Sequence, residues 1–470
     1  MSISSSSAET AYYILEWLIR IAAIAVVPLR RPPAAARGWL LLIFFLPVPG
    51  LLLFFAIGSP RFPKWRTQRF RELRPFFDAL GDRLRAAAPA DCGQAEPIAA
   101  LARTLGYLPA TGGNRIELID DYDGVIARLV EDIDAARHHV RLLVYIFADD
   151  DVGRKVAAAL ARAVKRSVAC RVMLDPVGSH KWTKGTMTLL RAAGVEVVEA
   201  LPFRLTKRRT RRDMRNHRKL FTIDGRIGYA GSQNIVSKNF RPGVVNRELV
   251  VRVVGPVVAE IEAVIRADWC LETNTIPESA IEIPPAAGDT QAQMLPSGSD
   301  YPLEGFETLL VWQAHQAREH IIMATPYFIP DEDVLGAMRT AVARGVAVHL
   351  VLSEVVDQRL VNLAQRSYYD DLLKAGVRIH LFRDFLLHAK NVSIDGRLAI
   401  IGSSNVDLRS FQLNEEASLL LYDAPAVASL EAIQRAYLDK SDEIALDTWR
   451  QRPMVQKLLE NLARLVGSLF

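Results

Sequence analysis

Two stretches of the chain carry the same polar residues at the same spacing. The first starts at His217 and the second at His388, and each continues with a Lys two residues later and an Asp five residues after that. Each then reaches a Gly-Ser-x-Asn sequence, at residues 231–234 and 402–405. A single His-x-Lys is expected by chance, whereas two copies that agree at six positions indicate a shared chemical role.

The chemistry that these residue types favour is attack on a phosphodiester. Residues i and i+2 of a strand point to the same face, so His217 should project beside Lys219, and His388 beside Lys390. A neutral imidazole can act as a nucleophile, while the ammonium and the Asn of each copy stabilise charge on phosphoryl oxygens. Two such faces brought together supply one nucleophile and one general acid for the leaving group.

The remaining motif residues are expected to shape the backbone or to lie near the phosphate. Asp224 and Asp395 each precede a Gly between apolar runs, as in a tight hairpin turn, so we expect structural roles for both. Gly231 and Gly402 should permit close backbone approach, and the serines that follow them lie near the phosphate or cap a helix. The candidate catalytic residues, as members of the motif, are His217, Lys219, Asp224, His388, Lys390 and Asp395. The candidate phosphate-binding residues are Ser232, Asn234, Ser403 and Asn405.

Each histidine also needs a carboxylate to fix its tautomer and stabilise its cation. Glu248 in the first half and Glu416 in the second follow the histidines at similar offsets, and Glu415 is an adjacent alternative to Glu416. We therefore expect Glu248 and Glu416 to orient the histidines. The alternative is that both are solvated surface carboxylates.

The elements that must position these residues recur as well. Short apolar runs alternate with helical patterns, which predicts an α/β fold, and the second half repeats the order of the first, which predicts an internal duplication. The strand, helix and strand expected at residues 141–147, 152–165 and 169–174 correspond to those expected at 320–330, 334–344 and 346–352.

Length and composition set the outer limits. The 470 residues suffice for two domains and an extension, and the net charge of +5 suggests an anionic partner, either nucleic acid or an acidic membrane surface. The three cysteines are far apart and odd in number, which favours buried free thiols in a reducing compartment. We expect a membrane hairpin at 1–60, a basic connector at 61–114, a first lobe at 115–278, a linker at 279–300 and a second lobe at 301–470.

The N-terminal segment is apolar. Residues 11–29 carry only Glu16 and Arg20, spaced to pair on one helix face, and residues 38–57 carry no charge and are long enough to cross a bilayer. We expect a transmembrane or re-entrant helical hairpin; a buried hairpin in a soluble domain is the alternative. More basic residues follow the second segment than separate the two, which favours a cytoplasmic location for the downstream lobes.

A dense basic run precedes and overlaps the first motif. Nine of the sixteen residues at 204–219 are Lys or Arg, and we expect Arg212, Arg215 and Arg218 to capture anionic lipid headgroups. A solvated loop and a nucleic-acid site are the alternatives.

At these residues the chain resembles the phospholipase D superfamily, whose signature is His-x-Lys-x4-Asp followed by Gly-Ser/Gly-x-Asn. Within it the chain is similar to bacterial cardiolipin synthases, through the N-terminal apolar pair, residues 215–219, the Thr-Pro-Tyr-Phe-Ile-Pro run at 325–330 and residues 405–411. It departs from their pattern at Asn391, at Glu415 and before His388, which bears on acceptor preference and channel shape.

The resemblance implies two pseudo-symmetric lobes, each a mixed sheet flanked by helices, that share one active site without a metal or other cofactor. It implies phosphatidyl transfer between two phosphatidylglycerol molecules, with His217 as the nucleophile and His388 as acid and then base. It also implies a multi-pass protein of the bacterial inner membrane.

The alternative functions are those of a lipid hydrolase, a nucleic-acid phosphodiesterase and a non-catalytic membrane scaffold. The apolar pair and the scarcity of aromatic residues in the basic run argue against nucleic acid.

Overall fold

The computed structural model describes residues 5–31, 33–59, 61–203, 213–277 and 280–465. The chain divides into two compact units. The N-terminal unit comprises the described residues of Met1–Pro63 and Phe203–Asp213, and the main unit comprises those of Lys64–Pro202 and Met214–Phe470.

The N-terminal unit consists of three helices, α1 (Ser5–Arg30), α2 (Pro33–Phe45) and α3 (Pro47–Ile57). Within α1, Glu16 and Arg20 form the expected ion pair at 3.2 Å. Among the described residues, one helical segment is both long and apolar enough to cross a membrane, namely Ala8–Arg30. The uncharged stretch at 38–57 is not one helix, because Pro47 begins a new helix and leaves two shorter apolar segments.

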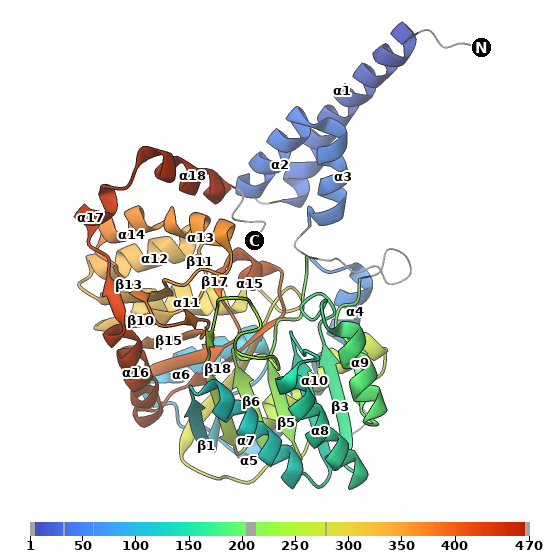
Figure 1. Ribbon diagram of the computed structural model, residues 1–470, viewed down its shortest axis with the longest axis vertical. Coiled ribbons are helices and arrows are strands. Elements are labelled where there is room, and N and C mark those ends of the chain that lie inside the picture. Colours follow the sequence, from blue (N-terminus) through green and yellow to red (C-terminus); the bar gives the residue numbers. More distant parts are fainter. Residues whose placement is uncertain (1–4, 32, 60, 204–212, 278–279, 466–470) are drawn as a thin grey trace. The chain divides into compact units, whose positions relative to one another are not determined.

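The main unit contains two lobes with the same strand order. In the first lobe the order is β1 (Thr111–Ile119), β8 (Val250–Val254), β6 (Ile227–Gly231), β5 (Leu220–Ile223), β2 (His139–Val144), β3 (Ala169–Leu174) and β4 (Glu196–Glu199). In the second it is β9 (Thr290–Ser297), β18 (Glu416–Leu421), β16 (Leu398–Gly402), β15 (Asn391–Ile394), β10 (His320–Ala324), β12 (Ala347–Ser353), β13 (Arg378–Phe382) and β19 (Ser441–Glu443). Apart from β19, each strand has its counterpart, so the predicted α/β fold and duplication are confirmed (Figure 1).

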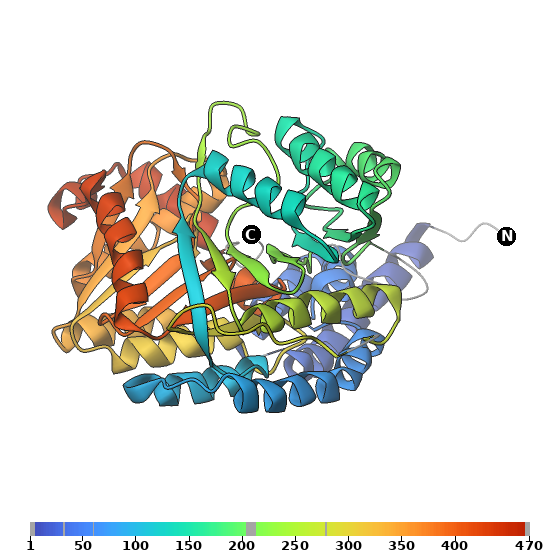
Figure 2. The ribbon, with the colours of Figure 1, turned by 90° about the horizontal axis from the view of Figure 1, so that it is seen from below.

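The lobes are joined through strands and not through a free linker. The range expected to be a linker, 279–300, ends in β9, which pairs with β18 along its length and with β1 at Thr111 and Asn114. Its sequence alternates polar Gln291 and Gln293 with apolar Ala292 and Met294, which is the two-residue period of a strand. Figure 2 shows β1 between the green and orange halves of this unit.

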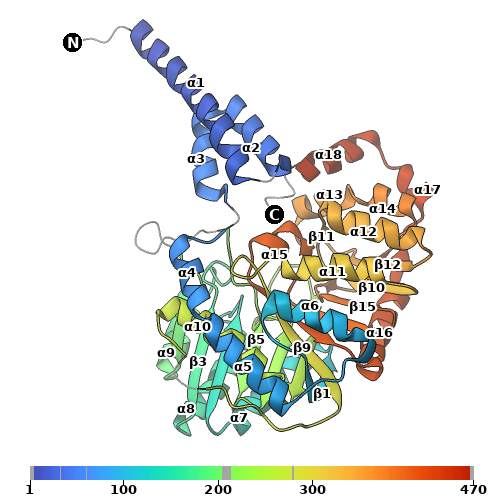
Figure 3. The same cartoon turned by 180° about the vertical axis from the view of Figure 1, so that it is seen from behind.

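Helices flank the sheet in both lobes. Those of the first lobe are α7 (Tyr122–Ala135), α8 (Asp151–Lys165), α9 (Thr183–Ala192) and α10 (Val258–Thr273). Those of the second are α11 (Gly305–Gln316), α12 (Glu332–Ala343), α13 (Arg359–Arg366), α14 (Tyr369–Ala375), α15 (Leu408–Gln412), α16 (Ala424–Asp439), α17 (Leu446–Arg450) and α18 (Met454–Leu465). The expected connector, 61–114, is mostly helical: α4 (Lys64–Glu72), α5 (Arg74–Ala87), η1 (Gly93–Ala95) and α6 (Glu96–Gly106) run along one side of this unit beside α10 and α11 (Figure 3).

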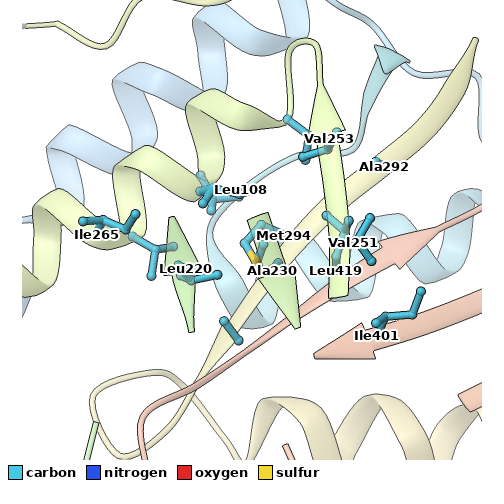
Figure 4. Close-up of a cluster of buried hydrophobic side chains, with 14 of the residues drawn as sticks. Leu108, Leu220, Ala230, Val251, Val253, Ile265, Ala292, Met294, Ile401 and Leu419 are labelled. Atoms are coloured by element: carbon cyan, nitrogen blue, oxygen red, sulfur yellow. The ribbon is translucent and has the colours of Figure 1, made fainter. Parts of the chain in front are cut away.

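One apolar core fills the space between the lobes. Leu220 and Val251 of the first lobe belong to the same buried cluster as Ile401 and Leu419 of the second, with Met294 of β9 among them (Figure 4). This shared packing fixes the position of the two lobes relative to each other. The three cysteines are buried thiols, as expected.

The motif glycines do allow close backbone approach. A Cβ on Gly231 would lie 2.5 Å from the Leu249 carbonyl oxygen, and one on Gly402 would lie 2.4 Å from that of Ala417. Both contacts involve backbone atoms, which cannot rotate away. Gly231 therefore lets β6 approach β8 beside Glu248, and Gly402 lets β16 approach β18 beside Glu416.

Replacing Gly402 tests this packing. We expect Gly402→Ala to lower the free energy of unfolding by about 1–3 kcal/mol, because the strands must separate. Gly336→Ala, in α12 where a Cβ would meet nothing within 4 Å, is the matched control and should be neutral or stabilising by up to about 1 kcal/mol. Denaturant unfolding measures the free energy of unfolding of both variants. If Gly402→Ala is as stable as Gly336→Ala, the proposed collision of a Cβ at position 402 with the backbone of Ala417 is contradicted.

Candidate active site

A short parallel strand pair joins the lobes immediately before His388. The pair is formed by β14 (Leu386–Leu387) and β7 (Asn246–Arg247) of the first lobe. The backbone N–H of His388 then donates to the carbonyl oxygen of Arg247 at 2.8 Å. This pairing places the second histidine beside the residue that follows Arg247, which is Glu248.

The same arrangement is repeated around the first histidine. Asn216 forms a parallel bridge with Glu415 of the second lobe. The N–H of His217 donates to the Glu415 carbonyl oxygen at 2.8 Å, and the N–H of Glu415 donates to the carbonyl oxygen of Arg215 at 2.8 Å. His217 therefore lies beside Glu416.

The two histidines consequently pair with carboxylates from opposite lobes. Nδ1 of His217 lies 3.0 Å from an oxygen of Glu416, and Nδ1 of His388 lies 2.7 Å from an oxygen of Glu248. Glu248 and Glu416 do contact the histidines, but each histidine is paired with the carboxylate of the other half. Similar offsets along the sequence could not reveal this, because the pairing arises from the contact between lobes.

The motif serines lie against these carboxylates. Ser403 donates to one oxygen of Glu416 at 2.5 Å, and Ser410 donates to the other at 3.1 Å. In the first lobe, Ser232 exchanges hydrogen bonds with the backbone of Leu249, the residue that follows Glu248. Ser403 thus contacts the carboxylate behind His217 directly, whereas Ser232 holds the backbone next to the carboxylate behind His388.

The two lysines are buried beside their histidines. Nζ of Lys219 donates to the carbonyl oxygen of His217 at 2.5 Å, and Nζ of Lys390 donates to that of His388 at 2.6 Å. Burial lowers the pKa of Lys219 to about 7 and that of Lys390 to about 8, although Glu248 and Glu416 oppose the effect. Lys390 also lowers the pKa of Lys219, so the two motifs lie within electrostatic reach of each other.

Burial and charge set the protonation of each histidine–carboxylate pair. Burial lowers the pKa of His388 to about 4, with Glu248 opposing it, and lowers the pKa of His217 while Glu416 opposes it. Burial alone would raise the pKa of both glutamates, but the paired histidines outweigh it and both pKa values lie below the ordinary value. At neutral pH the two carboxylates are therefore ionised and the two imidazoles are neutral.

Asp224 and Asp395 lie in the turns, as expected. Asp224 adopts a positive φ of 53°, and its carboxylate accepts the N–H groups of Arg137, His138 and His139 at 2.7–2.9 Å. Asp395, at φ 51°, accepts those of Arg318, Glu319 and His320 at 2.8–3.0 Å. Each aspartate anchors its hairpin to the start of the neighbouring strand.

The two asparagines differ in their contacts. The side-chain oxygen of Asn234 accepts the N–H of Ile146 at 2.9 Å, which ties it to the end of β2. The side-chain oxygen of Asn405 is buried and, among the described residues, has no hydrogen-bond partner. Asn405 thus offers a polar group to a ligand more directly than Asn234 does.

Sequence reasoning missed two tyrosines that flank the histidines. The ring of Tyr145 lies 4.7 Å from that of His217, and the ring of Tyr327 lies 6.3 Å from that of His388. Tyr327 donates to Asp357 at 2.6 Å, and Asp357 also pairs with Arg241 of the first lobe. The signal was present in the repeat, since Tyr145 directly follows β2 and Tyr327 comes shortly after the corresponding strand β10.

The arginines expected to capture headgroups have other surroundings. Arg212, with most of the basic run, lies outside the described residues. Arg215 is 2% exposed and pairs with Asp175 at 3.1 Å. Arg218 is fully buried and pairs with Asp268 at 2.6 Å and Glu415 at 2.8 Å. For Arg215 and Arg218 the expectation of a headgroup lip is therefore wrong, because burial and these carboxylates occupy both guanidinium groups.

Arg218 belongs to a buried ionic cluster behind His217. Its Nε donates to the carbonyl oxygen of Glu416 at 2.9 Å, which connects the cluster to the paired carboxylate. Arg66 of α4 adds contacts to Asp300 at 2.9 Å and Glu272 at 2.6 Å. Burial and then neighbouring carboxylates raise the pKa of Glu415 to about 8, despite Arg218. The cluster packs Glu415 against Arg218.

A separate carboxylate group lies in the second lobe. Oxygens of Glu307, Asp331 and Asp333 are within 4.8 Å of one another, a spacing that could hold a cation. Asp331 caps α12 by accepting the N–H of Val334 at 3.0 Å, and burial raises the pKa of Glu307 to about 9. These residues contact neither histidine, and a protonated Glu307 beside Asp331 accounts for the cluster without a ligand.

Comparisons with known proteins agree with this geometry. The chain matches the family described as "Cardiolipin synthase, PLD-like domain" over residues 129–269 and 310–437. It is 34% identical over 477 aligned residues to cardiolipin synthase A of Escherichia coli O1:K1 / APEC, covering 96% of this chain and 98% of that protein. The same values hold for cardiolipin synthase A of Klebsiella pneumoniae strain 342.

Solved structures share the fold. Phosphatidylserine synthase of Haemophilus influenzae Rd KW20 aligns with a TM-score of 0.59 at 15% identity, over 80% of this chain and all of that one. Polyphosphate kinase of Porphyromonas gingivalis aligns with a TM-score of 0.50 at 15% identity, over 74% of this chain and 52% of that one. At these identities the likeness concerns the two-lobed architecture.

The burial of Arg218 can be tested by removing it. We expect Arg218→Ala to destabilise the protein by about 3–5 kcal/mol, because Asp268 would remain buried without its counter-charge and Glu415 without its hydrogen-bond donor. Arg435→Ala, at an exposed position of α16, is the matched control and should change stability by less than about 0.5 kcal/mol. Unchanged thermal stability with weaker vesicle binding would instead support a headgroup role for Arg218.

Proposed function

Because the chain belongs to the family of cardiolipin synthases with phospholipase D-like domains, we propose that it joins two phosphatidylglycerol molecules into cardiolipin and releases glycerol. The family makes the chain a phospholipid phosphatidyltransferase. The choice of phosphatidylglycerol as both donor and acceptor is our proposal. The observation that supports the transfer reaction is the crossed pairing of His217 with Glu416 and of His388 with Glu248.

The crossed pairs suit a two-step transfer. In both histidines Nδ1 faces the carboxylate, so Nε2 is the ring nitrogen that reacts with a substrate; Nζ of Lys390 lies 3.3 Å from Nε2 of His388. The carboxylate holds the proton on Nδ1 and stabilises the cation that forms when Nε2 reacts. One site then contains two imidazoles that both direct Nδ1 to a carboxylate. The Nε2 atom of one can act as the nucleophile and that of the other can carry the proton.

In the first step, Nε2 of His217 attacks the phosphorus of one phosphatidylglycerol. A P–N bond forms and the bond from phosphorus to the headgroup glycerol oxygen breaks. That oxygen takes a proton from Nε2 of His388, and glycerol leaves. The negative phosphodiester favours the protonated form of His388 in the bound state, and the low pKa that burial gives this residue makes it a ready donor.

In the second step, a headgroup hydroxyl of another phosphatidylglycerol enters the place that glycerol left. His388 takes its proton, the hydroxyl oxygen bonds to phosphorus and the P–N bond to His217 breaks. Cardiolipin is released and both histidines return to their starting state. Water in place of the hydroxyl would give phosphatidic acid, so the outcome depends on excluding water from the intermediate.

The remaining residues divide between charge stabilisation and positioning. We assign Lys219, Lys390, Asn234 and Asn405 to the phosphoryl oxygens, since the lysines are buried beside the histidines and a bound anion would favour their charged form. Ser232 and Ser403 position the carboxylates. Asp224 and Asp395 support the hairpins.

The substrate and the first helix suggest a membrane location. We place α1 across the bacterial inner membrane, with α2 and α3 as a second, re-entrant or spanning segment, and the lobes in the cytoplasm. The six basic residues between Arg61 and Arg74, against three between Arg30 and Arg37, support this orientation.

Product analysis tests the reaction. Purified protein incubated with phosphatidylglycerol vesicles should give cardiolipin and free glycerol in equal amounts, without added metal. Phosphatidic acid as the main product would identify a lipid hydrolase and would overturn the proposed transfer.

The nucleophile is tested in the same assay by trapping the intermediate. His217→Ala should abolish turnover and the acid-quenched phosphatidyl adduct, while His315→Ala, at an exposed position of α11, should retain both. A covalent adduct that persists in His217→Ala would move the nucleophile to His388.

A further inference from the structure

The C-terminal helix α18 presents its apolar face to the outside. Six of its side chains are large and apolar, and each is between 49% and 78% exposed. At about 100° per residue they fall within one arc of the helix. These residues are Met454, Val455, Leu458, Leu459, Leu462 and Leu465.

Its polar face contacts the protein. Glu460 is 1% exposed and accepts from Arg366 and Arg452, both at 3.0 Å. Arg464 pairs with Asp371 at 3.3 Å and lies over the ring of Tyr368 at 4.2 Å. A surface helix of a soluble protein normally buries its apolar stripe and exposes its charges. Here buried ion pairs hold α18 in the opposite orientation.

Helix α13, along which α18 packs (Figures 1 and 3), also exposes an apolar side chain. Leu360 of α13 is 46% exposed, and Val356 just before this helix is 41% exposed. Exposed apolar surface of this kind on neighbouring segments marks a site of contact with another apolar phase. We call these two residues and the six of α18 the C-terminal apolar surface.

This surface adjoins the candidate active site. Asp357 and Gln358, which precede α13, both hydrogen-bond the hydroxyl of Tyr327, at 2.6 and 2.8 Å. The ring of Tyr327 lies 6.3 Å from that of His388. The start of α13 therefore connects the apolar surface with the surroundings of the second histidine.

We propose that the C-terminal apolar surface inserts into the lipid–water interface of an anionic bilayer, as a second membrane contact beside the catalytic lobes. The charges near it suit this partner. Of the four basic side chains at residues 446–465, Arg452 and Arg464 pair with Glu460 and Asp371, which leaves Arg450 and Lys457 as the basic flank of the helix. Amphipathic helices with basic flanks lie in such interfaces. That this contact also brings lipid to the site rests on the proposed function.

A reporter on α18 tests the insertion independently of turnover. The native cysteines are buried, so Leu462→Cys can be labelled with an environment-sensitive fluorophore in the full-length protein, with Arg435→Cys on α16 as the control. Both are reconstituted into vesicles of equal parts phosphatidylglycerol and phosphatidylcholine. We expect brominated lipid to quench the label at position 462 and iodide to spare it, and the reverse at position 435.

Two other results would overturn the proposal. Quenching of the label at position 462 by iodide, as at position 435, would show that the surface stays in water. Protection from both quenchers would show that protein covers it, either a second copy or another part of the chain.

A charge-insertion variant separates this contact from the chemistry. Leu458→Glu with Leu462→Glu should lower turnover on vesicles roughly tenfold or more, because two carboxylates would have to leave water. Turnover on monomeric short-chain phosphatidylglycerol should stay at the level of Arg435→Glu, a control at an exposed position of α16. Equal turnover of both variants on vesicles contradicts lipid delivery by this surface. Absence of turnover on short-chain lipid by the unmodified protein contradicts the proposed function instead.

Discussion

The site depends on two reciprocal backbone contacts between the lobes. The N–H of His217 is bonded to Glu415 of the second lobe, and the N–H of His388 is bonded to Arg247 of the first. In each case the next residue of the partner lobe is the glutamate that contacts the histidine. Neither lobe can therefore form a complete histidine–carboxylate pair alone. The shared apolar core and the joined sheet are what keep these contacts in register.

Such a site places many charges in a buried environment, and the structure balances them locally. Each glutamate is paired with its histidine, Ser403 also donates to Glu416, and each lysine lies near both glutamates. Behind His217, Arg218 spans Asp268 and Glu415 while donating to the backbone of Glu416. Buried ion pairs of this kind contribute little net stability, but removing one member is costly. Their effect here is to fix where the imidazoles point.

Much of this could be predicted from the sequence, because the duplication made each motif residue a repeated observation. The α/β lobes, the family, the enzyme class and the turns at Asp224 and Asp395 followed from period, spacing and resemblance. The crossing of Glu248 and Glu416 did not, since offsets along one lobe carry no information about contacts with the other. Arg218 was misassigned because a run of basic residues predicts exposure, whereas its partners Asp268 and Glu415 are distant in sequence. The strand at Thr290–Ser297 was hidden by the Pro- and Gly-rich residues before it.

The crossed pairing is tested most directly by the titration of the two imidazoles. NMR of protein with isotope-labelled histidine, assigned by single-histidine variants, gives the pKa of His217 and His388. Because a neighbouring carboxylate raises the pKa of its histidine, Glu416→Gln should lower the pKa of His217 and affect His388 little. Glu248→Gln should do the opposite. If Glu248→Gln instead shifts His217 while Glu416→Gln leaves it unchanged, each lobe pairs its own residues and the account of a single crossed site is wrong.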